Sequence, residues 1–310
     1  MEQVEKVYRN VNTSKSFSRN KGDILFYCLV LLIPLIQIGI FYFGVNFQSI
    51  MMAFKRYEDL GDGNYRYVWD FAQNIDTFKL EVQTKAFWGM VGSSFVVWLC
   101  TQFAGTILAL LFSYYIYKKK AFCKFFKFVL FLPSIIPALM LVLIFKYFLT
   151  EAMPAFFDTD KLILQDPEKF FWIITAFTVW ISFGSQVLVY TGAMEQVPPE
   201  ILEAGQIDGV TPFREFISLV IPYIAPTIAT FVIAGVATIF TNQNNLYSMY
   251  GLDIPNQAHA TIGYKLYSML DRSNGTSLYC YASFLGLLST CIAVPLTLLV
   301  RKFFSKVGGR

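Results

Sequence analysis

The residues whose types and spacing best suit a chemical role lie in one polar segment, residues 195–222, which reads EQVPPEILEAGQIDGVTPFREFISLVIP. Pro198 and Pro199 fix the backbone at a helix start, where the missing N–H of proline costs little. Glu200 and Glu203 add negative charge near the start, where the helix dipole favours it. The segment therefore has the features of a docking surface.

A short helix is predicted from about residue 200 to 207. It should stop at Asp208 and Gly209, because glycine readily takes the left-handed conformation that ends a helix. Thr211 followed by a proline predicts a second start, so two short helices should lie at an angle. Ala204 and Gly205 carry almost no side chain, which would let the surface of another protein approach the first helix closely. From these features alone, an ordinary amphipathic connector between two spans is also open.

Residues for other chemistry are sparse. The sequence contains no G-x-x-x-x-G-K-[ST] phosphate cradle, so this chain should not bind and hydrolyse ATP by itself. Its single histidine, His259, falls in a predicted outer loop with no second histidine near it, and the five cysteines have no paired spacing, so we expect no metal site or disulfide. Most acidic residues lie in loops, which argues against a carrier driven by protons or sodium through buried carboxylates. No cofactor is expected in this chain, and energy must come from a partner.

The elements that position the polar segment are predicted to be membrane spans. The chain has 310 residues and is 55% hydrophobic, 18% aromatic and 15% charged, a composition typical of proteins embedded in lipid. A span needs roughly 20 mostly apolar residues to cross a hydrocarbon core of about 30 Å. Six stretches qualify: residues 24–43, 90–115, 125–148, 171–194, 222–241 and 279–300. We predict an all-α integral membrane protein with six transmembrane helices and the polar segment between the fourth and fifth.

Lys and Arg set the predicted orientation, because they are enriched in cytoplasmic loops. They gather in the N-terminal segment, in the turn between the second and third spans, and in the tail. Both termini and the polar segment should therefore lie in the cytoplasm. The predicted organisation is a cytoplasmic segment at 1–23, a six-helix domain at 24–300 with an outer loop at 44–89 and the polar loop at 195–222, and a cytoplasmic tail at 301–310. The net charge of +4 is then a topology signal, and nucleic-acid binding is not expected.

Uncharged polar side chains inside the spans either tie helices together, which is the default, or face a water-filled path. The candidates are Ser134 in the third span, Thr178, Ser182 and Ser185 in the fourth, and Thr238 and Asn242 at the end of the fifth. Aromatic residues such as Trp180 and Tyr190 lie near them in the sequence. Sugars suit this mixture, because their hydroxyls need hydrogen-bond partners while their C–H faces pack on aromatic rings.

The segment 195–222 resembles the EAA loop of the membrane subunits of bacterial binding-protein-dependent ATP-binding-cassette importers. That pattern is EAA, three residues, a glycine, nine residues, then apolar residues and a proline. The matching positions are Glu203, Ala204, Gly205, Asp208, Gly209, Phe216 and Pro222, with glycine replacing the second alanine. The resemblance implies that these residues form a coupling helix that sits in a groove of a separate ATPase, which would bind ATP and Mg. It also implies that Pro222 ends the docking helix, so that the fifth span begins at a new angle.

The third and fourth spans are also similar to the maltose-type permease subunits of the carbohydrate-uptake class. Carried over by position, this resemblance implies sugar contacts at Ser134, Ala138, Thr178, Ile181, Ser182, Ser185, Thr238, Ile239 and Asn242. Ala138 and Ser185 stand where the relative has a hydroxyl and an aromatic ring, so the resemblance implies a sugar without specifying maltose. The first outer loop resembles that of smaller sugar permeases that pair with lipoprotein binding proteins.

Together these resemblances imply the permease subunit of an ATP-driven sugar or oligosaccharide importer in the bacterial cytoplasmic membrane, working by alternating access. The implied partners are a second permease subunit, usually a different chain, two ATP-binding-cassette ATPase subunits and an extracellular solute-binding protein.

Two alternatives stay open. An importer permease for an amino acid, a peptide or phosphate would need a fixed charge facing the path, and Lys146 is the only span residue that could supply one. A polytopic membrane glycosyltransferase would need a carboxylate or histidine cluster near a membrane face, and the only acidic cluster is the one that matches the EAA pattern.

Overall fold

The computed structural model describes residues 21–61, 64–157, 164–272 and 277–307. The basic residues expected in the cytoplasm before residue 21 lie outside these ranges, as does Arg310. The chain divides into two compact units, Met1–Met51 and Met52–Arg310. Each unit is described by itself.

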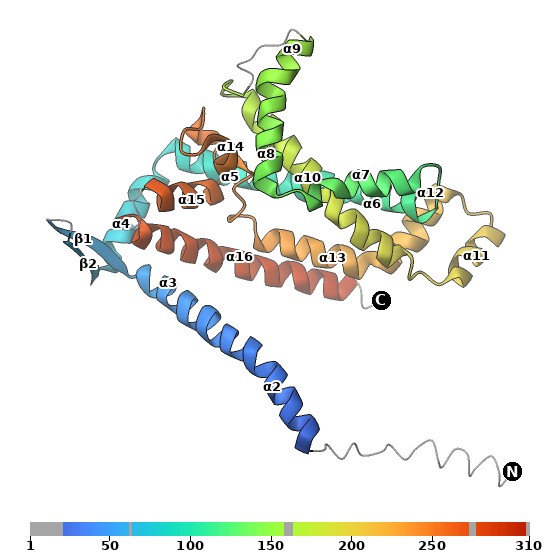
Figure 1. Ribbon diagram of the computed structural model, residues 1–310, viewed down its shortest axis with the longest axis horizontal. Coiled ribbons are helices and arrows are strands. Elements are labelled where there is room, and N and C mark those ends of the chain that lie inside the picture. Colours follow the sequence, from blue (N-terminus) through green and yellow to red (C-terminus); the bar gives the residue numbers. More distant parts are fainter. Residues whose placement is uncertain (1–20, 62–63, 158–163, 273–276, 308–310) are drawn as a thin grey trace. The chain divides into compact units, whose positions relative to one another are not determined.

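The first unit holds one long helical stretch (Figure 1). Its parts are α2 (Lys21–Gln37), the π-helical η1 (Ile38–Val45) and α3 (Asn46–Met52). Residues Ile24–Met52 are long and apolar enough to cross a membrane. The expected end of this span at residue 43 is wrong, because the helix runs on to Met52. Gly44 alone does not end it, since a glycine inside a helix costs only about 1 kcal/mol and apolar residues follow.

The second unit holds five more helical stretches that are long and apolar enough to cross a membrane, which gives six candidate spans in the described chain, as predicted. They are α5 (Lys85–Leu99) with η2 (Cys100–Ala104) and α6 (Gly105–Tyr117); α8 (Ala138–Tyr147) with η3 (Phe148–Ala152) and α9 (Met153–Phe157); α10 (Lys169–Met194); α12 (Pro212–Glu215) with η4 (Phe216–Val220) and α13 (Ile221–Ala237); and α16 (Tyr279–Val307).

The third span differs from the single helix expected over residues 125–148. A first helix, α7 (Cys123–Ile135), ends before an extended residue, Ile136, whose ψ is 134°. Pro137 is extended too, with ψ 130°, and α8 then leaves in a new direction (Figure 1). The bend follows because the residue before a proline is disfavoured in the helical region. The candidate span at this point is therefore Ala138–Phe156.

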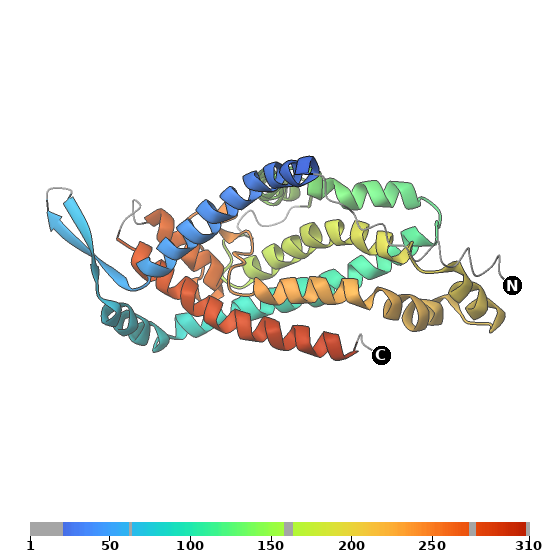
Figure 2. The same ribbon diagram turned by 90° about the horizontal axis from the view of Figure 1, so that it is seen from below.

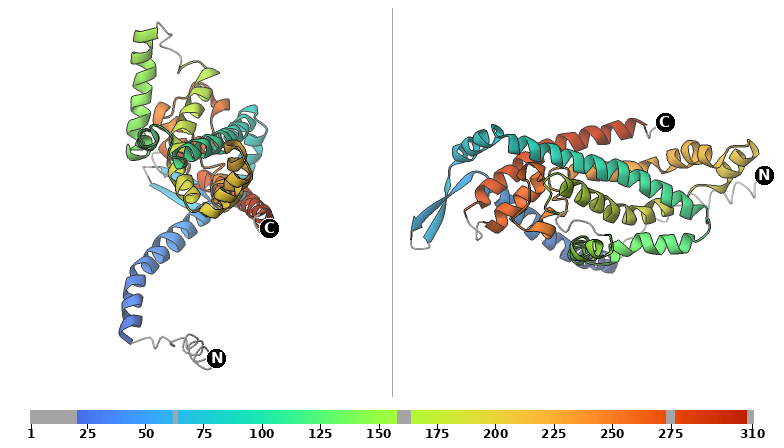
Figure 3. Two further views of the ribbon diagram at one scale, coloured as in Figure 1. Left: turned by 90° about the vertical axis from the view of Figure 1, so that its right-hand side faces the viewer. Right: turned by 90° about the horizontal axis from the view of Figure 1, so that it is seen from above.

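The fourth span, α10, forms the centre of the second unit and packs against α6, α7 and α13 (Figures 2 and 3). Tyr190 on this helix is fully buried. The Ser113 hydroxyl of α6 donates to the carbonyl of Val187 at 3.0 Å, which ties the two spans together in their buried interface. A Cβ at Gly184 would overlap the carbonyl oxygen of Leu130, so glycine lets α7 approach closely.

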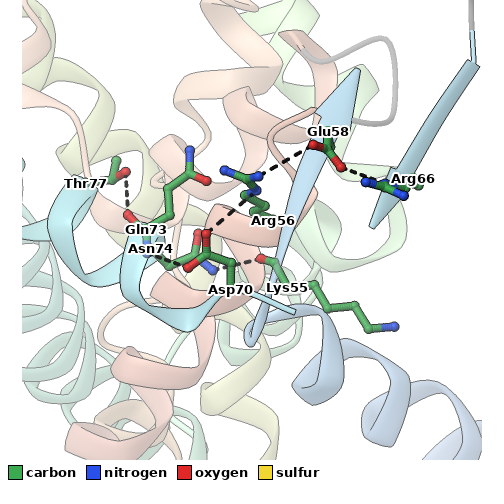
Figure 4. A network of polar contacts seen from close by, with 8 residues as sticks. All are labelled: Lys55, Arg56, Glu58, Arg66, Asp70, Gln73, Asn74 and Thr77. Carbon is green, nitrogen blue, oxygen red and sulfur yellow. Dashed lines mark hydrogen bonds and ion pairs between the residues drawn. The ribbon is translucent and has the colours of Figure 1, made fainter. Parts of the chain in front are cut away.

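A β-hairpin adds to the helices that the sequence predicts. Its strands, β1 (Lys55–Gly61) and β2 (Asn64–Trp69), pair antiparallel and lead into α4 (Phe71–Val82). Figure 4 shows the polar network at their junction. Asn74 Nδ2 donates to the carbonyls of Ala53 and Lys55 at 2.9 and 3.0 Å. The expectation of an all-α protein is thus replaced by a mostly helical one.

Three short elements follow α13 in the region expected to form an outer loop. They are α14 (Leu246–Tyr250), a 3-10 turn η5 (Gln257–His259) and α15 (Ile262–Arg272). Lys265 of α15 forms an ion pair with Glu81 of α4, and the hydroxyl of Tyr281 on α16 donates to the same carboxylate at 2.6 Å. This contact joins three elements at the end of the unit that carries the hairpin.

Candidate functional site

The polar segment predicted as a docking surface lies at the end of the second unit opposite the hairpin (Figure 1). Its first helix, α11, spans Pro199–Ile207, and α12 spans Pro212–Glu215. Each helix begins with a proline that follows an extended residue, with ψ of 131° at Pro198 and 155° at Thr211. Both helix starts agree with those predicted from the sequence.

The end of α11 is closed by glycine, as predicted. Gly209 has φ +70°, the left-handed conformation that favours glycine. The N–H of Val210 donates to the carbonyl of Gly205 at 2.9 Å, and the N–H of Gly209 donates to the carbonyl of Gln206 at 3.1 Å. These paired bonds form a Schellman motif, which satisfies carbonyls that the helix end leaves open. The motif fixes the direction in which the chain leaves α11.

The prediction that Pro222 ends the docking helix is wrong. The π-helical η4 runs directly into α13, and the backbone stays helical at Ile221, with φ −57° and ψ −47°. Proline cannot donate to the preceding α-helical turn and its ring crowds that turn. The π-helical hydrogen bonding of η4 provides another backbone arrangement just before Pro222. The fifth span therefore continues from α12 without a new start.

The outward face of the segment carries two apolar side chains that the sequence reasoning did not single out. Ile207 is 87% exposed and Phe213 is 73% exposed. The predicted docking residues that are exposed beside them are Glu203, Ala204, Asp208 and Gly209. Exposed apolar side chains next to carboxylates suit a protein partner, because apolar anchors supply most of the energy of recognition.

Two predicted docking residues face inward instead. Gly205 is buried, and a Cβ built on it would lie 2.7 Å from Cδ1 of Leu219, so its missing side chain serves packing within the segment. This corrects the expectation that Gly205 opens the helix to another protein. Phe216 is 5% exposed, and its ring centroid lies 4.7 Å from that of Tyr114 on α6. Gly205 and Phe216 thus hold the segment in shape.

A buried carboxylate anchors the segment to the second span. Glu215 is 5% exposed, and its Oε1 lies 2.5 Å from Nζ of Lys118 and 3.2 Å from the hydroxyl of Tyr114. The same hydroxyl lies 2.9 Å from the carbonyl of Pro212, to which it donates. Sequence reasoning missed Glu215, although an acid just before the apolar run of a span is a signal that could have identified it.

Some of the predicted path residues lie in or next to a second feature, a turn after α13 that contacts α10. Asn244 and Asn245 have φ of +53° and +56°, which asparagine tolerates better than most residues. Their side-chain amides donate to the hydroxyls of Thr175 and Thr178, each at 3.0 Å. Thr178 therefore ties the turn to α10, which is the default role for a polar residue in a span.

Four predicted hydroxyls are more accessible. Ser134, Ser185 and Thr238 are exposed, and Ser182 is half-buried. The hydroxyls of Ser182, Ser185 and Thr238 donate to carbonyls of their own helical segments at 3.0 to 3.2 Å. Each oxygen keeps lone pairs that can accept a hydrogen bond from a solute.

The other predicted path positions lie in three different places: the turn after α13, the core around α10 and the bend between α7 and α8. Asn242 lies in the turn, where its Oδ1 accepts from the N–H of Asn244 at 2.8 Å, and Ile239 beside it is buried. Ile181 is half-buried and packs against the core around α10. Ser134 and Ala138, in contrast, lie at the bend between α7 and α8, and no hydrogen bond joins them to the turn within the described residues.

The charged residue weighed as a solute contact has a different partner. Nζ of Lys146 donates to the carbonyl of Met249 at 2.9 Å, in the last turn of α14. A cation there satisfies a carbonyl that the helix end leaves open and complements the helix dipole. Lys146 therefore joins α8 to α14.

Comparison with known proteins identifies relatives of this chain. The family model of the "Binding-protein-dependent transport system inner membrane component" matches residues 103–307. The multiple sugar-binding transport system permease protein MsmF of Streptococcus mutans is 24% identical over 267 residues, which cover 83% of this chain and 88% of that protein. The maltose/maltodextrin permease protein MalF of Escherichia coli is 25% identical over 162 residues, 50% of this chain but only 31% of MalF.

The fold also matches solved structures. One is the crystal structure of a bacterial alginate ABC transporter in complex with an alginate pentasaccharide-bound periplasmic protein. A chain of that structure aligns with a TM-score of 0.75 at 19% identity, covering 95% of this chain and 99% of that one. At this identity the match establishes the fold.

Proposed function

This chain belongs to the family of binding-protein-dependent transport system inner membrane components, and on that premise we propose that it is the permease subunit of an ATP-driven sugar or oligosaccharide importer. It is a transport subunit and not an enzyme. The observation that carries the proposal is an exposed docking segment, α11 and α12, which follows the fourth of six candidate spans and leads directly into the fifth. The protein is a multi-pass protein of the bacterial inner membrane. We assign both termini to the cytoplasm from the distribution of Lys and Arg.

We assign ATP hydrolysis to a separate ATPase that binds ATP and Mg and receives α11 in a groove. The residues assigned to this contact are Glu203, Ala204, Asp208 and Gly209, together with Ile207 and Phe213. Gly205 and Phe216 shape the segment from within, whereas Pro222 is exposed in the first turn of α13. The further partners are a second permease subunit, a second ATPase subunit and an extracellular solute-binding protein.

A carbohydrate is the solute that the observations favour. The relatives are described as sugar, maltose and maltodextrin permeases, and the structural neighbour belongs to an alginate importer. Ser182, Ser185 and Thr238 offer hydroxyl acceptors of the kind that sugar hydroxyls need. An amino acid, a peptide or phosphate would need a fixed charge in the path, and Lys146, the candidate for that charge, donates to a backbone carbonyl.

The mechanism is alternating access. Closure of the ATPase pair would draw the docking segments together, and their displacement would turn α10 and the turn after α13 that hydrogen-bonds to it. Solute delivered by the binding protein would enter from the outer side when the path opens there. In this scheme no residue of the chain has a catalytic role.

The test is ATP hydrolysis by the complete complex in nanodiscs, measured with its binding protein and a panel of sugars, amino acids and inorganic phosphate. We expect hydrolysis to rise only with one or more sugars. Stimulation by an amino acid or by phosphate, with no response to any sugar, would overturn the carbohydrate assignment.

A further inference from the structure

The cytoplasmic end of α6 meets the docking segment in a small polar cluster that the EAA pattern does not include. Lys118 and Glu215 form an ion pair with an N to O distance of 2.5 Å. The Tyr114 hydroxyl lies 3.2 Å from the same carboxylate oxygen. Nζ of Lys118 lies 5.8 Å from the centre of the Tyr114 ring. Two segments that are about a hundred positions apart in the chain are thus joined by charge.

Stability alone is a weak reason for such a pair. Taking two charges out of water costs about as much as their attraction returns, and apolar residues of similar size commonly serve as well. The side chains of Glu215 and Lys118 are only 7% and 24% exposed, so this cost applies here. Compared with apolar residues, a buried ion pair fixes the two segments in one geometry, because neither charge can move away without losing its partner.

The pair lies between the docking segment and the second span, where displacement of α11 would be transmitted to the spanning helices. Gly205 of α11 packs on Leu219 of η4, which fixes α11 to the start of the fifth span. Glu215 is the last residue of α12, immediately before η4. Its partner Lys118 directly follows α6. The docking segment is thereby connected to the second span as well as to the fifth.

The second span in turn is joined to the helix that carries the predicted path residues. The Ser113 hydroxyl donates to the carbonyl of Val187 on α10 at 3.0 Å, and the rings of Phe112 and Phe183 stack with centroids 5.9 Å apart. A continuous set of contacts therefore runs from α11 through Glu215 and α6 to α10.

We propose that Lys118 and Glu215 are positioning residues that transmit displacement of the docking segment to the second span and, through it, to α10. This inference rests on the proposed function, because it assumes that α11 is moved by an ATPase. The pair touches neither solute nor ATP. Its role is to make the second span turn together with the fifth, so that each cycle of hydrolysis opens the path.

The experiment compares Lys118→Met, Glu215→Gln and the double variant in the complete complex in proteoliposomes. The double variant removes the pair without leaving an unpaired charge. The measurement is solute transported per ATP hydrolysed, with the amount of ATPase that copurifies as the measure of assembly. Lys120→Met is the matched control, since Lys120 lies in the same turn and forms no ion pair with any described residue.

We expect the double variant to assemble normally and to transport at least about five-fold less solute per ATP, and the control to match the wild type. Exchanging the charges, Lys118→Glu with Glu215→Lys, should restore part of the ratio. A wild-type ratio in the double variant would overturn the inference. Failure of the double variant to assemble would overturn it too, because the pair would then be needed for folding.

Gly209→Val separates this inference from the proposed function. If Gly209→Val uncouples transport while the double variant does not, only the positioning role of Lys118 and Glu215 fails. If Gly209→Val also leaves ATPase binding and transport unchanged, the assignment of α11 as the coupling element fails.

Discussion

Replacing Gly209 gives the simplest quantitative test of the coupling segment. Its φ is +70°, and a Cβ built on it would meet no atom within 4 Å. The cost of a side chain there is therefore conformational and not steric. A residue with a Cβ loses roughly 1–2 kcal/mol in the left-handed conformation. Asparagine loses less because its side chain tolerates this region, and β-branched valine loses more.

The segment can avoid this cost only by giving up its Schellman motif. That would break the bonds from Val210 to Gly205 and from Gly209 to Gln206, each worth about 1 kcal/mol net. On either route, Gly209→Ala lowers the ratio of the docking conformation to other conformations by about five- to thirty-fold, the factor that corresponds to 1–2 kcal/mol. The apparent affinity for the ATPase should fall by up to the same factor, because only the docking conformation binds.

The assay titrates the ATPase against the assembled membrane subunits in nanodiscs and compares Asn, Ala and Val at position 209. We expect affinity to decrease in that order, with Asn close to the wild type. Gly192→Ala is the control, because Gly192 is an ordinary helical glycine in α10 with nothing within 4 Å of its Cβ position. Wild-type affinity for the Val variant, or equal losses for Asn and Val, would contradict a requirement for the left-handed conformation at position 209.

The other predictions use different parts of the chain. Ile207→Ser and Phe213→Ser should each weaken ATPase binding by roughly ten-fold or more while membrane insertion stays intact, since burying such a side chain contributes about 1.5–3 kcal/mol; a binding titration checks this. Gly184→Ala should destabilise the protein by about 1–3 kcal/mol in thermal unfolding, because its Cβ would overlap a carbonyl of α7, whereas Gly192→Ala should not. Asn242→Ala should lower sugar uptake several-fold without changing ATPase assembly, and unchanged uptake of every sugar tested would remove Asn242 from the path.

The docking helix could be predicted from the sequence because its signals are local. Proline at the start of α11 and Gly209 at its end act through their own backbone preferences, and the structure has both where they were expected. The six spans were predictable for a similar reason, since length and apolar composition decide whether a helix can cross a membrane.

Some features could not be predicted from local sequence signals, because they depend on packing or because two sequence signals, such as an apolar run and a proline within it, oppose each other. The bend at Ile136 and Pro137 lies inside an apolar run, and the run alone indicated one span. The hairpin β1–β2 is polar and aromatic, and its stability depends on contacts such as those of Asn74.

In the candidate site, too, the features with local signals could be predicted and those that depend on packing could not. A glycine in a docking helix can allow close approach of a partner protein or close packing within its own chain. Only the contact with Leu219 shows that Gly205 is needed for packing within the chain. The hydroxyl of Thr178 could have faced a solute, but the left-handed turn that brings Asn245 to it has no clear signal in the sequence. The ion pair of Glu215 could not be predicted, because its partner Lys118 follows a different helix, α6, about a hundred positions earlier in the chain.

We infer that this chain moves a sugar by coupling to a separate ATPase through α11. The most direct measurement is accumulation of radiolabelled sugars in proteoliposomes that contain the complete complex, with ATP inside and the binding protein outside, for the wild type and for Gly209→Val. We expect ATP-dependent accumulation of at least one sugar by the wild type and its loss in the variant. Accumulation that continues without ATP, or that is equal in the variant, would contradict it.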